Sequence, residues 1–405
     1  MRLKKVCSVF WKGKFFENYV FLVMVVLVFI FGMYGLVKTP QKKSISENRT
    51  LAQYQHLTIN GFLSGRFQDN FEKALSDQFL MSERIRLTYN DIVNRLPKYG
   101  IDQVVCQGRY ILIGGANYRN ARFDCDDNIV VLPKEMTQVR TEIARQNVAK
   151  YSRVNELANT FYYIIEEPDM FDFESGQRLT DVKAFLKENI VGKYGFSYLH
   201  FDTYDEYEKL FYKTDHHLSS NGQYLAYVDI AKLLDVDNIA VPVETVSHHE
   251  LFFGTRARDA RYYDSFEEFD FLRFELPKHS TMVNRKESKY GHYDEYMNHE
   301  YKYNKTYPFY SWVYGGDVGE IIFDYNQPKK DNLLVFSNSF DNPIVPVLAQ
   351  HFNKTYAVDL RHYRKDIGES YVLSKYIKEN KIDKVLFIMS SRYIFDKNSN
   401  QGLEL

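Results

Sequence analysis

The residues with the clearest capacity for chemistry lie just after Thr214, where an aspartate and two histidines are adjacent. Asp215 and His217 are two positions apart, so in an extended segment their side chains project to the same side. A carboxylate at that spacing can hold an imidazole in one tautomer and stabilise its charged form, as a general base requires. The same three residues could instead be metal ligands, or could simply satisfy polar groups in the core. This segment alone leaves all three interpretations open.

A second candidate is Ser339, which closely follows the apolar run at 333–336. The run predicts a short buried strand, and the sequence after it predicts helix 343–352, strand 356–360, helix 370–380 and strand 384–389. Such an alternation places Ser339 at the carboxyl end of a parallel strand, where open α/β sheets present ligands. Amides at the start of the next helix would offer partial positive charge to a developing oxyanion. A serine in such a loop can also be only a helix cap.

Asp215, His217 and Ser339 together supply the orienting acid, the base and the nucleophile of a Ser-His-Asp system. A metal site would need a further ligand from elsewhere, and the sequence has no paired His or Cys spacing that supplies one. The combination therefore favours catalysis over metal binding.

The elements that must position these residues follow from local patterns. Ser219 and Ser220 are natural N-caps for a helix whose apolar residues recur from Tyr224 to Leu234. Residues 161–165 predict a buried strand, and residues 181–189 predict a helix. We therefore expect the Asp-His segment at a strand-to-helix corner of an α/β domain with three layers and a mainly parallel sheet.

The first half of the chain predicts further elements. An amphipathic helix is expected from about Phe67 to Leu96, a β-hairpin at 99–115 and a helix at 134–158. Cys106 and Cys125 could form a disulfide across the loop that follows this hairpin.

The N-terminus predicts the compartment. Residues 19–37 are an uncharged apolar run long enough to cross a bilayer, and Tyr34 near its end disfavours signal cleavage. Basic residues precede the run, which places the N-terminus in the cytoplasm: Arg2, Lys4, Lys5, Lys12 and Lys14. We expect a cytoplasmic tail at 1–18, a single-pass anchor in the cell membrane at 19–37, a spacer at 38–60 and an extracytoplasmic domain at 61–405.

Composition adds two exclusions. The 405 residues carry a net charge of −1, which gives no indication of nucleic-acid binding, and three cysteines are too few for a disulfide scaffold. Residues 241–314 are dense in aromatic side chains that could line a carbohydrate groove or form core. Within this region Gly254 could turn a backbone amide toward a site, or could simply occupy a turn.

At these residues the sequence resembles the DHHW proteins, which belong with the alginate O-acetyltransferase-like branch of the SGNH hydrolases. The resemblance extends over most of the chain, from Ser46 to the C-terminal strand. It depends on these motifs: Ser46-Glu47-Asn48-Arg49-Thr50-Leu51-Ala52, Asp77-Gln78-Phe79, Thr214-Asp215-His216-His217, Tyr314-Gly315-Gly316-Asp317, Asp341-Asn342-Pro343-Ile344 and Asp359-Leu360-Arg361-His362-Tyr363.

By that resemblance Ser339 is the nucleophile, His217 the base, Asp215 its orienting acid and His216 a structural residue. Residues in the other motifs, with Gly254, become candidates for contacts with substrate or oxyanion: Asn342, Gly315, Gly316 and Arg361. The chain departs from the family at Leu218, where Trp is usual, and at Ser337-Asn338-Ser339, where Gly-Asp-Ser is usual. Loss of the Asp is expected to remove a polar support beside the nucleophile.

The resemblance implies acyl-group transfer or removal on a cell-envelope or extracellular polysaccharide, through an acyl-serine and without a cofactor. The first expectation is a membrane-anchored O-acyltransferase, with O-acetyl transfer the expected reaction and a multi-spanning membrane acyltransferase as the partner that delivers the acyl group. The alternatives are a polysaccharide acetylesterase and a catalytically impaired glycan-binding protein of the same fold.

Overall fold

The structure is a computed structural model. It describes residues 19–27, 29–31, 33–34, 37–44, 49–79, 85, 88, 137–172, 177–178, 180–252, 254–260, 267–288, 310–336, 338–395 and 403. The expected hairpin at 99–115 and the Cys106–Cys125 pair lie outside these residues. The chain divides into two compact units, Met1–Ile101 and Asp102–Leu405. The domain boundaries expected from the sequence stay predictions.

The first unit contains a short hairpin and two helices: β1 (Lys43–Ser44), β2 (Arg49–Thr50), α2 (Ile59–Leu63) and α3 (Arg66–Gln78). Helix α3 forms where the amphipathic pattern predicts it, and Phe67 stacks on Phe71 at 5.9 Å between ring centroids. It ends at Gln78, where Phe79 takes an extended backbone conformation. Residues 85 and 88 are helical again, and the rest of the expected helix up to Leu96 lies outside the described residues. The Gln78 side chain bonds both the amide and the carbonyl of Gln41, which fixes the end of α3 to the segment just before β1.

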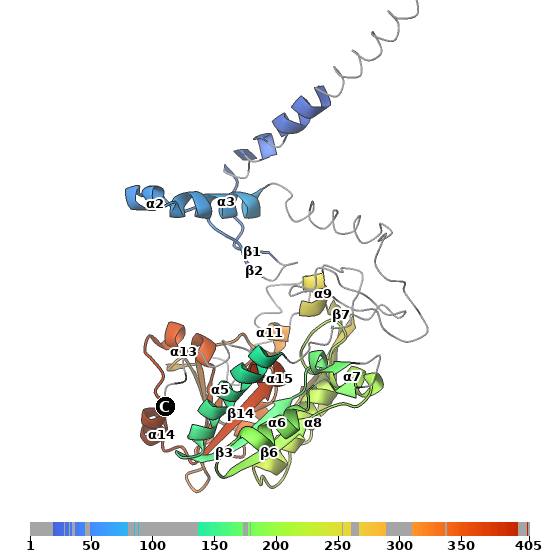
Figure 1. Cartoon of the computed structure of the whole chain (residues 1–405), viewed down its shortest axis with the longest axis vertical. Helices are drawn as coiled ribbons and strands as arrows, with labels where there is room; N and C mark the ends of the chain where they lie inside the picture. The colour runs from blue at the N-terminus through green and yellow to red at the C-terminus, as the bar shows by residue number, and fades with distance from the viewer. Residues whose placement is uncertain are drawn as a thin grey trace, which may run out of the picture. The chain divides into compact units, whose positions relative to one another are not determined.

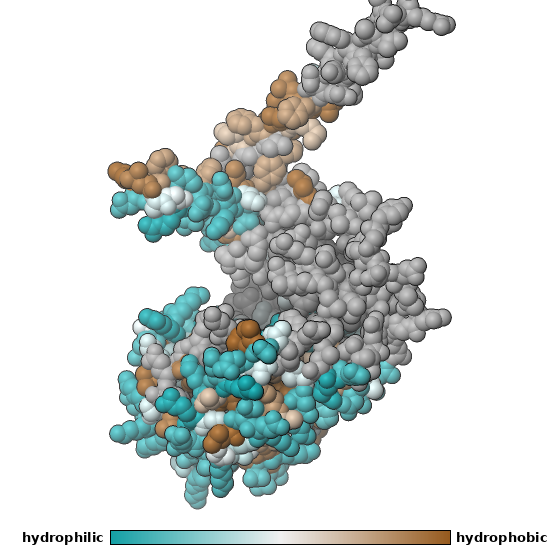
Figure 2. All heavy atoms as spheres, in the orientation of Figure 1, coloured by the Kyte–Doolittle hydropathy of each residue, from teal (hydrophilic) through white to brown (hydrophobic). Residues whose placement is uncertain are grey.

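The described residues between 19 and 37 are mostly helical, and their large apolar side chains are exposed, from Tyr19 to Val37. This exposed apolar surface appears in brown in Figure 2. Within the described ranges, none of the helices has both the length and the apolar character needed to cross a bilayer. The anchor expected at 19–37 therefore stays a prediction.

The second unit is built on an eight-stranded sheet with the order β10-β9-β11-β13-β12-β14-β3-β6. The strands from β13 to β6 run parallel, and β11, β9 and β10 extend the sheet antiparallel. Their bounds are β3 (Asn159–Ile165), β6 (Tyr194–Leu199), β9 (Ser280–Val283), β10 (Lys286–Glu287), β11 (Glu320–Asp324), β12 (Leu333–Phe336), β13 (Lys354–Val358) and β14 (Lys384–Ser390).

Helices cover both faces of this sheet because the central strands are apolar on both sides (Figure 1). On β12, Leu333 and Val335 belong to one core, whereas Leu334 and Phe336 belong to the other. The first core includes α7 (Tyr204–Leu210), α8 (Ser220–Leu233) and α12 (Val345–Ala349). The second includes α5 (Gln138–Val154), α6 (Val182–Asn189), α13 (Leu360–Ile367), α14 (Leu373–Asn380) and α15 (Ser391–Phe395). The expected mixed α/β fold with a large, mostly parallel sheet is confirmed.

A second, smaller sheet lies over the Asp-His segment. Strands β7 (Glu244–Phe252) and β8 (Glu267–Arg273) pair antiparallel, with α9 (Thr255–Ala260) directly after β7. Phe252 and Phe269 pack with Tyr212 and with α11 (Tyr310–Tyr314) in a small core of their own. The remaining elements are η1 (Pro168–Met170), β4 (Phe171–Asp172) and β5 (Gln177–Arg178).

Two expectations about the surroundings of the site are wrong in detail. The Asp-His segment connects α7 to α8, so it lies at a helix-to-helix loop and not at a strand-to-helix corner. Helix α12 begins only at Val345 and has five residues, because residues 339–344 form turns. The amides that flank Ser339 therefore belong to turns and not to a helix N-terminus.

Candidate active site

Residues 211–219 form a closed loop that presents Asp215 and His217. Phe211 and Leu218 pair as an isolated antiparallel bridge, and the Tyr212 amide donates to the His217 carbonyl at 3.1 Å. Ser219 then caps α8, because its hydroxyl accepts the Gly222 amide. The two ends of the loop are thus held together, and the acid and the base lie between them.

Asp215 and His217 form a buried hydrogen-bonded pair. The Nδ1 atom of His217 lies 2.5 Å from Oδ1 of Asp215, and the His217 amide donates to the same oxygen at 3.0 Å. Oδ2 accepts the Thr255 amide at 2.7 Å, so both carboxylate oxygens are used. The Nε2 atom of His217 is buried and has no hydrogen-bond partner among the described residues. Because Asp215 holds Nδ1, Nε2 is the atom left to accept a proton.

The charges around the pair favour an ionised Asp215. Burial raises the pKa of Asp215, but the facing His217, the adjacent His216 and Arg258 outweigh it and hold the pKa well below its ordinary value. Burial, helped by repulsion from His217, lowers the pKa of His216 to about 3. At neutral pH His216 is therefore a neutral imidazole, and it lies next to the ionised carboxylate of Asp215.

Glu267 supports the loop from the small sheet. Its Oε1 accepts both the amide and the hydroxyl of Thr214 at 2.7 Å, and its Oε2 accepts the Lys213 amide at 2.7 Å. The Gly254 amide in turn donates to Oγ1 of Thr214 at 2.9 Å. A Cβ on Gly254 would come within 2.4 Å of the Thr214 carbonyl oxygen and 2.5 Å of Asp215 Cβ, so glycine is required for this close approach. In this conformation Gly254 braces the acid and does not offer its amide to a ligand.

Glu267 should make stability depend on pH. Burial raises its pKa from about 4.5 to about 7, so between these values the folded state holds a proton that the unfolded state lacks. We expect the free energy of unfolding to fall by about 1–3 kcal/mol as the pH rises from 4.5 to 7. Glu267→Gln should flatten this slope in urea unfolding, whereas the control Glu268→Gln, on an exposed neighbour, should retain it. A flat profile in the unmodified protein would contradict the assignment.

Ser339 lies in a tight turn at the carboxyl end of β12. The Asn338 amide donates to Oδ1 of Asp341 at 2.6 Å, and Oδ1 of Asn338 accepts the Phe340 amide at 2.9 Å. Nδ2 of Asn338 also donates to the carbonyl of Ile388 on β14 at 2.7 Å. Asn338 and Asp341 are buried and Ser339 is half-buried, so the turn is fixed and presents the serine at its apex. The expected loss of support at position 338 is therefore wrong: the carboxamide itself ties the turn to β14.

Replacing Asn338 by Asp should destabilise the turn. A carboxylate keeps the acceptor for Phe340 but loses the donor, and it places negative charge against the Ile388 carbonyl. We expect a loss of about 1–3 kcal/mol in the free energy of unfolding at neutral pH. Asn326→Asp, on an exposed turn, provides a matched control for urea unfolding. Equal stability of the two variants would show that the bond to Ile388 contributes nothing.

Tyr310 connects the two candidate regions. Its ring stacks on the His217 imidazole with 3.7 Å between centroids and 4° between planes. Its hydroxyl donates to the backbone carbonyl of Ser339 at 2.9 Å, and burial raises its pKa well above the ordinary value, which keeps it a donor. Phe340, the residue after Ser339, also contacts this ring, with 5.2 Å between the ring centroids of Phe340 and His217. The structure thus brings the serine turn and the Asp-His loop into one neighbourhood.

Asp317 lies close to most of the other residues predicted to contact substrate or oxyanion. Arg361 bonds Oδ2 of Asp317 at 2.9 Å, and Nδ2 of Asn342 donates to its Oδ1 at 3.3 Å. Gly315 and Gly316 directly precede Asp317; Gly315 has a φ of 77°, and Gly316 is exposed. One polar network around Asp317 therefore includes Asn342 and Arg361, and the two glycines directly precede it in the sequence. Gly254 is not part of this network and packs against Thr214 and Asp215.

The metal alternative fits the donor set less well. Asp215, His216 and His217 have ligand atoms within 4.8 Å of one another. However, both oxygens of Asp215 accept N–H groups, and one ring nitrogen of His217 is held by that same carboxylate. This arrangement is that of an orienting acid with its base.

Sequence reasoning missed Tyr310, Glu267, Thr255 and Asp317 as parts of the site. Asp317 was visible only as the last residue of a family motif. Tyr310, Glu267 and Thr255 lie in the aromatic and charged stretch that has no clear periodicity. Only the fold shows that this stretch meets residues 214–217.

Together these features define a mixed α/β domain with a large, mostly parallel sheet, which fits an SGNH-like fold, and with an Asp-His pair near a strand-end serine. Comparison with solved structures points to the DHHW type of this fold. A DHHW family protein from Eubacterium siraeum matches with a TM-score of 0.51 and 16% identity over 69% of this chain and 93% of that one. Bacillus cereus PatB1 with a sulfonyl adduct matches with a TM-score of 0.51 and 18% identity over 68% and 96%.

No protein-family model matches the sequence, and comparison with curated proteins gives no match either. At these low identities the structural likeness concerns the fold. The resemblance to the DHHW proteins that the sequence motifs predicted is confirmed at that level.

Proposed function

We propose that this chain is a membrane-anchored O-acyltransferase that transfers acetyl groups to a cell-envelope or extracellular polysaccharide. The observation that supports it most is the buried Asp215–His217 pair, because Tyr310 stacks on the His217 ring and also bonds the Ser339 carbonyl. A base with a fixed tautomer beside a half-buried serine is the arrangement that nucleophilic acyl transfer requires.

In the proposed reaction, Oγ of Ser339 attacks the carbonyl carbon of an acyl donor while Nε2 of His217 takes its proton. The same proton passes to the departing group of the donor, which leaves an ester on Ser339. A hydroxyl of the polysaccharide then attacks this ester as His217 accepts its proton, and Ser339 recovers its hydrogen. Asp215 stays ionised and stabilises the imidazolium in both halves.

Two other functions are alternatives to acyl transfer. Water in place of the sugar hydroxyl would make the protein an acetylesterase through the same acyl-serine. A glycan-binding protein without turnover is favoured by one observation: Nε2 of His217 has no hydrogen-bond partner within the described residues, so the base does not engage the serine in this conformation.

Acceptor-dependent turnover separates these functions. The full-length protein in detergent is incubated with 4-nitrophenyl acetate, with or without de-O-acetylated alginate oligosaccharides as a probe acceptor. Transfer predicts O-acetylated oligosaccharide by mass spectrometry, and hydrolysis predicts only free acetate. Retention of the oligosaccharide with neither product would favour the binding protein and contradict the enzyme.

We also propose that residues 19–37 anchor the domain in the membrane. The exposed apolar side chains of the described residues in this segment support the proposal, and so do the basic residues before it. A multi-spanning membrane acyltransferase is the proposed source of the acyl group.

Protease added to intact cells tests the orientation. We expect the chain beyond Lys38 to be digested while an epitope placed within residues 2–14 stays protected. Disruption of the membrane should expose that epitope as well, which provides the control. A large domain that resists digestion only while cells are intact would overturn the extracytoplasmic assignment.

A further inference from the structure

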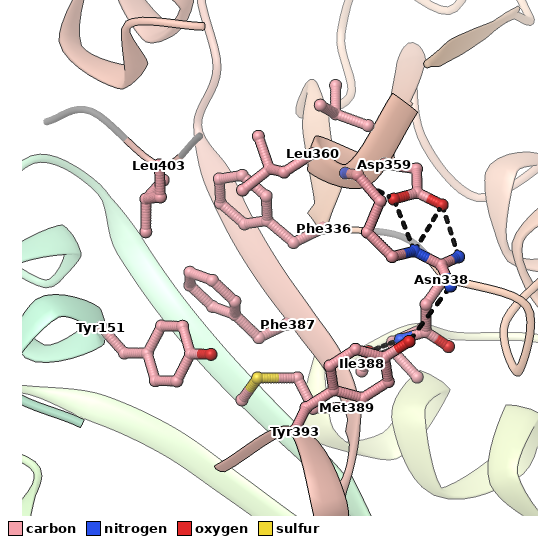
Figure 3. A pocket seen from close by; sticks show the side chains of 12 residues that line it. Tyr151, Phe336, Asn338, Asp359, Leu360, Phe387, Ile388, Met389, Tyr393 and Leu403 are labelled. Carbon is pink, nitrogen blue, oxygen red and sulfur yellow. Dashed lines mark hydrogen bonds and ion pairs between the residues drawn. The ribbon is translucent and has the colours of Figure 1, made fainter. Parts of the chain in front are cut away.

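A small cavity opens beside the serine turn, between the carboxyl ends of three strands. It has a volume of about 50 Å³. Its lining from the sheet comes from Phe336 on β12, Val358 on β13, and Phe387 and Met389 on β14. Tyr151 of α5, Tyr393 of α15 and Leu403 close its other sides (Figure 3).

The cavity is divided by polarity. Phe336, Phe387, Met389 and Leu403 are all buried and give it apolar walls. Polar groups gather at one side, where Asn338 lies near Asp359 and Tyr393 in Figure 3. There Nη1 of Arg361 bonds the Tyr393 hydroxyl at 3.1 Å, and Asp359 and Asp317 hold the rest of the guanidinium. Because two carboxylates already neutralise Arg361, this side suits a neutral polar group better than an anion.

The position of the cavity is the one where this class of sheet binds ligands. Strand β13, which follows β12 in the sequence, lies on one side of β12 in the sheet. The next strand, β14, lies on the other side of β12. That reversal is a topological switch point, and ligands of open α/β sheets bind outside the strand ends at such a point. Asn338, which lines the cavity, directly precedes Ser339.

The volume limits what fits. A cavity needs about 10–15 Å³ for each water-sized group, so 50 Å³ holds on the order of four non-hydrogen atoms. An acetyl group has three and a propionyl group four, whereas butyryl has five. A short acyl group also matches the division of the walls, with its methyl end apolar and its carbonyl end polar.

We propose that this cavity binds the acyl chain of the substrate and that Met389 and Leu403 set its maximum length at about propionyl. The proposal rests on the proposed acyl transfer at Ser339 for its role in catalysis. Its binding component can be measured separately.

The test uses the full-length protein in detergent and two readouts. The first is labelling of Ser339 by methane- and butanesulfonyl fluoride, followed by mass spectrometry. The second is ligand-detected NMR with acetamide, propionamide and pentanamide, which reports binding without chemistry. Met389→Ala enlarges the cavity, and Val385→Ala is the matched control, because Val385 is buried on the same face of β14 but does not line the cavity.

In the unmodified protein we expect the methane reagent to label at least tenfold faster than the butane reagent, and only the two shorter amides to bind. Met389→Ala should reduce this discrimination at least fivefold in both readouts, and Val385→Ala should leave it unchanged. Size-selective amide binding without any labelling would refute acyl transfer but support the cavity. Chain-length profiles that Met389→Ala does not change in either readout would overturn the inference.

Discussion

Replacing Ser339 by alanine is expected to reduce acetyl transfer by at least about 10³-fold and to abolish labelling by methanesulfonyl fluoride. The substitution removes the attacking oxygen and leaves the turn in place, because the hydrogen bond between Ser339 and Tyr310 uses the backbone carbonyl of Ser339. The hydrogen bonds of Asn338 with Asp341 and Ile388 also do not involve the hydroxyl. Initial rates and intact-protein mass spectrometry measure the two effects.

Ser374→Ala serves as the matched control, since Ser374 is an exposed serine on α14. It should leave both rate and labelling unchanged. Full labelling of the Ser339 variant would place the nucleophile elsewhere and would remove the central residue of the proposed mechanism.

Asp215→Asn should reduce the turnover rate by about 10⁴-fold with little change in substrate affinity. The asparagine can still accept the Thr255 amide through its oxygen, but its NH₂ group then faces Nδ1 of His217. That contact favours the tautomer with the proton on Nε2, which is the atom that must accept one. The imidazolium also loses the adjacent carboxylate, whose low pKa reports how strongly the two groups interact.

The comparison variant for this experiment is Asp205→Asn, in the first turn of α7 and outside the acid-base pair. It should retain the unmodified rate. Circular dichroism and urea unfolding establish that the Asp215 variant is folded. A folded Asp215 variant with a rate within tenfold of the unmodified protein would rule out the orienting role.

The sequence allowed the prediction of those parts that depend on local pattern. The apolar runs of β3, β12 and β14 and the N-cap at Ser219 lie as expected, because periodicity and capping are local. The Asp-x-His spacing also allowed the prediction of a same-side acid-base pair. The pair forms in a loop with one isolated bridge, so the spacing was informative although the surrounding elements were misplaced.

The parts that could not be predicted depend on contacts between distant segments. Nothing in the residues near Tyr310 indicates that its ring will stack on His217, since α11 reaches that position through the core of the small sheet. Helix α13 was missed because its residues Leu360–Ile367 are mostly polar and directly follow a strand. The role of Gly254 required the approach of β7 to the Thr214 backbone, which no local pattern encodes.

The strand order has a consequence for how the chain matures. β3 and β6 come early in the second unit, yet β3 pairs with β14, which is the last strand of the sheet. Loop closure on this scale is slow, and the edge of β3 that pairs with β14 must wait for the end of the chain to emerge. During synthesis, one edge of the apolar strand β3 can pair with β6, whereas the other edge would stay unpaired until β14 arrives. The yield of folded protein would then depend more on a chaperone that binds β3, or on rapid release of the chain from the ribosome, than on the stability of the finished sheet.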